Sequence, residues 1–174
     1  METIDCIKSR RSRRKFLDKE IPGEIIEKLV EAGISAPSSM DCQPWHFIIV
    51  KDKKTKEQLA ELKEENNQEH ILTAPLSIVV CVDTEKSPKR FIEDGVTATE
   101  NILLAVHALG LGSVYVTGCN PLDRTVDDKI RNILNLPENI MPVTVLPVGY
   151  ADSSENLENK ELVKTSDVIH YEKW

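Results

Sequence analysis

The 174-residue chain lacks the features that mark several large classes of protein. No run of 18 or more apolar residues occurs, so we expect no membrane-spanning helix and no membrane partner. The first residues carry their positive charge after a short apolar patch, which is the reverse of a secretory signal. No internal repeat and no low-complexity linker interrupts the chain. Its length fits one domain, residues 1–174.

Cysteine and glycine are also scarce. The four cysteines are scattered and form no C-x-x-C pair: Cys6, Cys42, Cys81 and Cys119. Reduced thiols in a cytoplasmic protein are the default for this pattern, and no metal site is expected because zinc ligands need clustered spacing. The seven glycines form no nucleotide-binding fingerprint, so the sequence does not choose between NADH and NADPH. The four histidines are dispersed, and His107 is best interpreted as a structural residue.

The apolar pattern predicts strands that alternate with helices. A short helix begins near Thr3, and further helices are predicted over residues 22–33, 53–64, 94–109 and 125–134. Strands are predicted over residues 46–52, 76–83, 113–118 and 141–150. This alternation favours a layered domain with helices on both faces of one sheet. The periodicity alone does not decide whether the sheet is parallel or mixed.

The end of the chain turns apolar and aromatic after a polar spacer. Its last seven residues read V-I-H-Y-E-K-W, residues 168–174. These side chains need a surface on which to bury. An arm that reaches another subunit would satisfy them, and so would a tail that docks on its own domain.

Positive charge is concentrated in one place, although the formal net charge of the chain is −7. Six Lys or Arg side chains fall within the basic segment, residues 8–15, which reads K-S-R-R-S-R-R-K. A nucleic-acid patch is disfavoured, because the rest of the chain is acidic and no nucleic-acid-binding motif accompanies the segment. Arginine offers a planar fork that matches phosphate, and a serine between arginines adds a donor. Phosphate binding and a plain solvated surface both stay open.

A second candidate is the serine loop, residues 36–45, which reads A-P-S-S-M-D-C-Q-P-W. Two prolines and two serines cannot continue the preceding helix, so hydroxyl and backbone groups are presented before a strand. The alternative is a connecting turn with Trp45 as a core anchor. Cys42 within the loop is best interpreted as a small apolar residue.

The two stretches together resemble the FMN-dependent nitroreductase family. The motif R-R-S-x-R-x-F is followed by A-P-S-S-x-x-x-Q-P-W-x-F and a buried strand. Three later stretches extend the resemblance in the right order: ATENILLAVHALGLGS, ILNLPENIMPVTVLPVGYA and IHYEKW. The resemblance therefore spans nearly the whole chain.

The resemblance implies a fold and an assembly. The expected fold is α+β, a three-layer α/β/α sandwich with a mixed, largely antiparallel sheet. The family forms homodimers with two FMN molecules at the subunit interface. It also implies a domain-exchanged C-terminal arm, here residues of about 152–174, which favours the arm over the docked tail.

The resemblance also implies the cofactor-binding residues. These are Arg10, Arg11, Ser12, Arg14, Pro37, Ser38, Ser39, Asp41, Thr117, Gly118, Lys160 and Lys164. Arg10 and Ser12 would bind the phosphate, and Arg14 the N1/O2 edge of the flavin ring. Arg13 would point elsewhere. The serine loop would line the flavin from the other subunit, the backbone at 117–118 would approach N5 and O4, and one of the two late lysines would complete the phosphate site.

One member of this set departs from the family, which most often has Asn where this chain has Asp41. An ionised carboxylate can only accept hydrogen bonds, whereas an amide also donates. If Asp41 faced the flavin, it would add negative charge beside an anionic cofactor. The alternative is that Asp41 caps a turn and never contacts the flavin.

The activity implied by the resemblance is that of an FMN-dependent NAD(P)H oxidoreductase. Hydride would pass from the reduced nicotinamide through flavin N5 to an electron-poor acceptor such as a nitroaromatic or a quinone. No catalytic side chain is obligatory, because the cofactor carries the chemistry. The alternatives are a flavoenzyme of the same fold that cleaves flavin or removes halogen, and a non-catalytic flavin-binding redox protein.

Overall fold

A five-stranded sheet forms the centre of the protein. The structure is a computed structural model that describes residues 1–62, 68–120, 124–157 and 161–174. The strands are β1 (Trp45–Val50), β2 (Leu76–Asp83), β3 (Gly112–Ser113), β4 (Val116–Thr117) and β5 (Ile140–Gly149). Their order is β1-β2-β5-β3, and β4 also pairs with β5. Each of these pairings is antiparallel.

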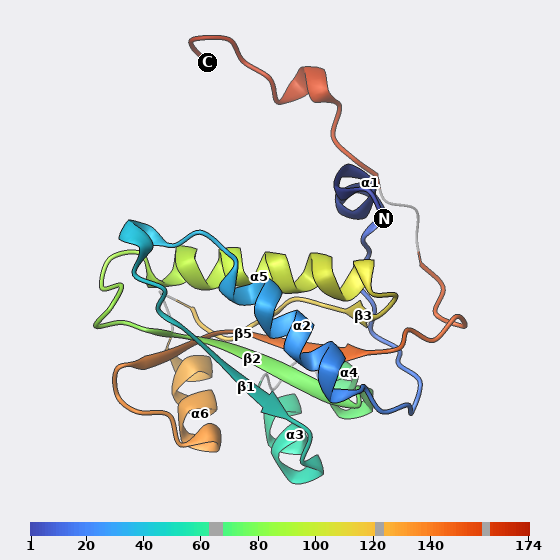
Figure 1. Cartoon of the computed structure of the whole chain (residues 1–174), viewed down its shortest axis with the longest axis vertical. Helices are drawn as coiled ribbons and strands as arrows, with labels where there is room; N and C mark the ends of the chain where they lie inside the picture. Colours follow the sequence, from blue (N-terminus) through green and yellow to red (C-terminus); the bar gives the residue numbers. More distant parts are fainter. Residues whose placement is uncertain (63–67, 121–123, 158–160) are drawn as a thin grey trace.

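Helices cover both faces of the sheet, which gives three layers (Figure 1). One face carries α2 (Gly23–Ile34) and α5 (Phe91–Ala108), and the other carries α3 (Lys53–Ala60), α4 (Glu69–Thr73) and α6 (Thr125–Leu134). Helix α1 (Thr3–Ser9) lies against the later part of α5, where the Cys6 thiol donates to the Leu104 carbonyl at 3.4 Å. The expected layered α+β architecture is therefore confirmed.

Strand β2 shows why its apolar run is continuous. Successive side chains of a strand point to opposite faces. Ile78 and Val80 pack in the core under α2 and α5, while Val79 and Cys81 pack in the core under α3 and α6. All four are 0 % exposed. Burial raises the pKa of the Cys81 thiol to about 12.

Several elements differ from the sequence prediction: α4 was not expected, and α3 ends at Ala60 although its predicted helix ran to residue 64. Helix α5 begins at Phe91, three residues before the expected start, and the strand predicted over residues 113–118 is divided into β3 and β4. The register continues from one short strand to the other, which places Val114 opposite Pro147 of β5. Proline has no N–H to donate to a ladder, so the pairing is interrupted there.

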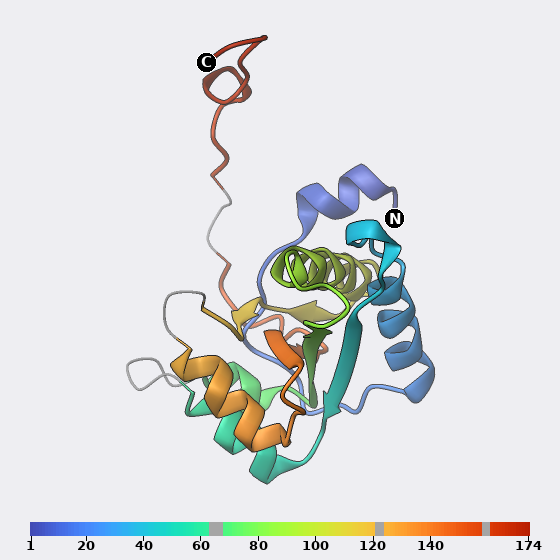
Figure 2. The ribbon, with the colours of Figure 1, turned by 90° about the vertical axis from the view of Figure 1, so that its left-hand side faces the viewer.

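The end of the chain leaves the body as an arm (Figures 1 and 2). Each residue from 161 to 174 is exposed, with Tyr171 at 80 % and Trp174 at 101 %. The arm contains the short helix η2 (Thr165–Asp167) and a stacked pair of rings, His170 and Trp174, with centroids 4.1 Å apart. These residues do not dock on the domain of their own chain.

None of the helices whose positions are described combines the length and the apolar character needed to cross a bilayer.

Candidate functional site

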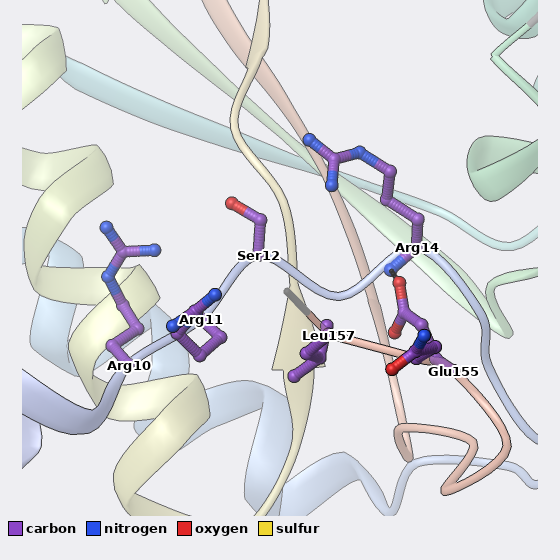
Figure 3. Close-up of a pocket in the computed structure, with 7 residues that line it drawn as sticks. Arg10, Arg11, Ser12, Arg14, Glu155 and Leu157 are labelled. Atoms are coloured by element: carbon purple, nitrogen blue, oxygen red, sulfur yellow. Dashed lines mark hydrogen bonds between the residues drawn. The ribbon is translucent and has the colours of Figure 1, made fainter. Parts of the chain in front are cut away.

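After α1 ends at Ser9, the rest of the basic segment runs extended to the edge of the sheet. The Arg13 N–H donates to the Ser113 carbonyl at 2.9 Å, and Phe16 forms a bridge with Ala151 just after β5. Alternate residues of an extended chain point to the same side. Figure 3 shows the side chains of Arg10, Ser12 and Arg14 projecting to one side of the backbone.

Arg13 faces the other way and has a structural role, as the sequence analysis expected. Its Nη2 donates to the Asp152 carbonyl at 2.8 Å, and its Nε lies 3.1 Å from Glu155 Oε2. The second carboxylate oxygen, Glu155 Oε1, accepts the Arg14 backbone N–H at 2.9 Å. Arg13 and Glu155 thus hold the chain that follows β5 against the basic segment.

A cleft of about 470 Å³ opens over this segment (Figure 3). Its lining consists of Arg10, Arg11, Ser12, Arg14, Glu155, Asn156 and Leu157. Three arginines face one carboxylate that Arg13 already pairs, so the cleft is positive within an acidic chain. Such a cleft concentrates anions. Four of the predicted site residues therefore meet in one place.

His107 joins α1 to the end of α5 beside this cleft. Its Nε2 lies 2.8 Å from Ser9 Oγ, and the Ser9 hydroxyl donates to the Asp5 carbonyl at 2.6 Å. The imidazole N–H therefore donates to Ser9. Burial, and to a lesser degree the nearby charge of Arg10, lowers the pKa of His107. This favours the neutral ring and agrees with a structural role.

The serine loop is organised by Asp94, a buried aspartate in the first turn of α5 that is 4 % exposed. Its Oδ1 accepts the Ser39 N–H at 2.8 Å. Its Oδ2 accepts the Ser87 hydroxyl at 2.6 Å and the Cys42 thiol at 3.8 Å. The Asp94 carbonyl accepts the Trp45 indole N–H at 2.8 Å. One residue thus fixes the middle and the end of the loop.

Further hydrogen bonds form within the loop and between the loop and α5. The Ser38 hydroxyl oxygen accepts the Gln43 N–H at 3.0 Å, and the Pro37 carbonyl accepts the Thr97 hydroxyl at 3.1 Å. Asp41 is exposed, and its Oδ1 accepts the Gln43 side-chain amide at 3.0 Å. The backbone φ of Asp41 is 54°, in the left-handed region that aspartate tolerates better than most residues. Within its own chain, Asp41 therefore stabilises a turn.

Thr117, Gly118 and Lys164 are not among the residues that line the cleft. Thr117 ends β4, and the next residue, Gly118, donates its N–H to the Val143 carbonyl at 2.8 Å. A Cβ at Gly118 would come within 3.1 Å of the Thr144 backbone nitrogen, so a larger residue would push the two backbones apart by a few tenths of an ångström. Lys164 is exposed on the arm immediately before η2, and Lys160 lies outside the described residues.

The two halves of the predicted site do not meet within one chain. The serine loop packs on the beginning of α5 through Asp94, whereas α1 lies along its later part, at Leu104 and His107. Arg10 of the basic segment pairs with Glu100 at 3.7 Å, about 9 Å along the helix from Asp94. At 1.5 Å per residue, Asp94 and His107 are about 20 Å apart along the helix. The described residues that line the cleft include no member of the serine loop.

Sequence reasoning missed two carboxylates, Asp94 and Glu155. An acidic residue in the first turn of a helix is ordinarily explained by the helix dipole, which hides the second use of Asp94. Glu155 lies in a polar stretch with no motif. No local signal pointed to either residue, because their partners are distant in the sequence. The loop residues that donate to the Asp94 carboxylate lie 52 or more residues before it, and Arg14 lies 141 residues before Glu155.

Comparison with known proteins identifies the family. The nitroreductase family model matches residues 7–69 and 61–150, which is most of the chain. The chain belongs to the nitroreductase family. A relative from Methanothermobacter thermautotrophicus is 40 % identical over 176 residues, covering 100 % of this chain and 88 % of that protein. Its name proposes NADH dehydrogenase or NAD(P)H nitroreductase activity. The resemblance inferred from the motifs is thus confirmed.

Solved structures of nitroreductases show the same fold. A crystal structure from Parabacteroides distasonis, whose name proposes the same two activities, superimposes with a TM-score of 0.89 at 37 % identity and covers 99 % of this chain and 98 % of its own. An FMN-dependent nitroreductase from Clostridium difficile gives a TM-score of 0.83 at 31 % identity, covering 98 % of this chain and 99 % of its own. Membership of this family places the chain among the oxidoreductases.

Proposed function

We propose that this nitroreductase is an FMN-dependent NAD(P)H oxidoreductase that works as a homodimer on an electron-poor acceptor such as a nitroaromatic or a quinone. The observation that carries the proposal is the cleft of about 470 Å³ into which Arg10, Ser12 and Arg14 project from one side of the basic segment. The FMN dependence named for the Clostridium difficile relative supports the choice of cofactor.

The donors in the cleft fit a phosphate monoester. Guanidinium groups bind phosphate oxygens through paired, charge-assisted hydrogen bonds, and a hydroxyl adds a further donor. The cleft volume lies within the range of about 300–1,000 Å³ that is usual for cofactor sites. The charge of Glu155 is offset by its ion pair with Arg13, at 3.1 Å, and its Oε1 accepts the Arg14 N–H.

Two observations support the homodimer: the serine loop does not line the cleft of its own chain, and the arm is exposed over residues 161–174. A cofactor held in the cleft of one chain would contact a serine loop supplied by a second copy. The arm exposes large apolar side chains that gain stability only by burial against another surface. They are Leu162, Val163, Val168, Ile169, Tyr171 and Trp174.

The residues of the chain would bind and orient the cofactor. FMN, when bound, supplies the transfer of hydride between the nicotinamide and the acceptor. Arg10 and Ser12 would hold the phosphate, while the guanidinium of Arg14 would stabilise negative charge on the ring. The backbone at Thr117 and Gly118, held against β5 by the Gly118 N–H bond to the Val143 carbonyl, would approach the N5 and O4 side of the ring.

The experiment that tests the proposal is an anaerobic turnover assay on protein incubated with FMN. NADH and NADPH serve as donors, and menadione and a nitrofuran serve as acceptors. We expect bound flavin and turnover, both reduced by the double variant Arg10→Ala and Arg14→Ala. The matched control is Arg90→Ala, an exposed arginine at the beginning of α5. Colourless protein that takes up no FMN would overturn the proposal.

A further inference from the structure

We propose that Asp94 is a positioning residue that holds the serine loop in the shape required by the flavin site of the second copy. The inference rests on the proposed function, because it concerns the same site. It assigns a role to a residue that lies outside the stretches that carry the resemblance and outside the lining of the cleft of its own chain.

The first support is the number of donors that converge on one buried carboxylate. The Ser39 N–H, the Ser87 hydroxyl and the Cys42 thiol reach Asp94 from two separate segments, at 2.8, 2.6 and 3.8 Å. A carboxylate only accepts hydrogen bonds, so both of its oxygens are suited to this ring of donors. An amide in its place would turn one acceptor into a donor and leave a donor without a partner.

The second support is the backbone of the loop. Met40, Asp41 and Gln43 have φ angles of 54°, 54° and 44°, in the left-handed region. Non-glycine residues persist in this region only when surrounding contacts fix them. Ser39, directly before Met40, and Cys42, directly before Gln43, are the two loop residues that donate to the Asp94 carboxylate. The bonds to Asp94 therefore flank Met40 and Asp41 and hold them in place, while the Gln43 N–H is held by the Ser38 hydroxyl.

The third support is the position of Asp94 on α5. The cleft of its own chain is lined by the basic segment and by residues after β5, and Asp94 does not line it. The serine loop that Asp94 fixes would therefore act in the site that the second copy provides. A loop that holds the competent shape for only a fraction of the time weakens the apparent affinity by that fraction.

The test compares Asp94→Asn with a matched control, Asp127→Asn. Asp127 is also a buried aspartate in the first turn of a helix, with Arg124 Nε 3.2 Å away, but its helix α6 covers the other face of the sheet. Loss of a charge-assisted bond predicts FMN binding about 10- to 100-fold weaker in Asp94→Asn. The control should show a lower Tm with unchanged FMN affinity. Equal FMN affinity in Asp94→Asn and the unmodified protein would overturn the inference.

If Asp94→Asn fails to fold, the variant Ser87→Ala tests the inference instead. This change removes one donor to the same carboxylate from outside the loop. We expect several-fold weaker FMN binding, and an unchanged dissociation constant would overturn the inference. Failure of the unmodified protein to bind FMN would instead overturn the proposed function.

Mixed dimers distinguish positioning across the subunits from a general loss of stability. A dimer of one Asp94→Asn chain and one Arg10→Ala chain should contain one site with both defects and one site with neither. We expect half of the sites to bind FMN with the unmodified affinity. Two equally weakened sites would show that Asp94 acts within its own subunit and would overturn the inference.

Discussion

Replacing Arg10 with alanine should weaken cofactor binding far more than it weakens folding. In the free chain, Arg10 Nε lies 3.7 Å from Glu100 Oε1, and the two side chains are 26 % and 48 % exposed. An ion pair this exposed contributes between about 0 and 1 kcal/mol to stability. A charged hydrogen bond to phosphate contributes about 1.5–3 kcal/mol to binding. The two effects therefore differ enough to be measured separately.

The expected changes follow from these magnitudes. The FMN dissociation constant of Arg10→Ala should rise about 10- to 150-fold. Its Tm should fall by no more than about 4 °C, because 1 kcal/mol corresponds to about 2–4 °C in a chain of this length. Glu100 and the phosphate would compete for the Arg10 guanidinium. Glu100→Gln removes the carboxylate and leaves the guanidinium to the phosphate. That variant should bind FMN with unchanged or up to about fivefold tighter affinity.

Quenching of flavin fluorescence in a titration with apoprotein measures the dissociation constant directly. The control is Arg90→Ala, which breaks the Arg90–Glu93 pair at 2.9 Å at the beginning of α5, away from the cleft. A dissociation constant for Arg10→Ala within twofold of the unmodified value would refute the placement of the phosphate. An equal loss in the Arg90 variant would show that the effect is one of net charge alone.

Three further predictions concern pH, packing and assembly. Because the pKa of His107 is lowered on folding, its contribution to stability is complete above pH about 6.5 and is lost as the pH falls toward the lowered value. The pKa of His70 is also lowered, chiefly by burial, so both histidines contribute to this slope. Urea unfolding between pH 5 and 8 should show it, with each histidine contributing no more than about 1.4 kcal/mol per pH unit, and His107→Gln should reduce it, whereas His170→Gln on the arm should not. Gly118→Ala should lower stability by about 1–3 kcal/mol, because the new Cβ would push two backbones apart. Gly23→Ala, with nothing within 4 Å, should be neutral or stabilising by up to about 1 kcal/mol, and equal unfolding midpoints for the two variants would contradict the packing argument. Removal of residues 161–174 should shift the protein toward monomer in light scattering and abolish FMN retention, and a dimeric, FMN-bound truncated protein would show that the arm is dispensable.

Much of the fold could be predicted because burial leaves a direct mark on the sequence. The strand predicted over residues 76–83 matches β2 residue for residue, since both of its faces are buried and its apolar run is unbroken. The strand predicted over residues 113–118 was less accurate, because its division depends on Pro147 in a partner strand. Local patterns contain no information about such partners.

The candidate site could be predicted only in part for the same reason. The resemblance implied that Arg13 points away from the ligand, and the structure shows that Arg13 contacts Asp152 and Glu155. The role of Arg13 depends on partners that lie 139 or more residues later in the chain. The use of Asp94 likewise depends on how the serine loop folds back over α5. Motifs located the segments of the site, whereas tertiary contacts assign the role of each side chain.

The position of Cys81 in the sheet has a practical consequence. A thiol with no exposed surface and a pKa of about 12 is almost entirely protonated and inaccessible to alkylating reagents. Its labelling in the native protein must therefore wait until β2 separates from its neighbours. The rate at which iodoacetamide modifies Cys81, followed by mass spectrometry, reports how often the centre of the molecule opens, without any engineered probe.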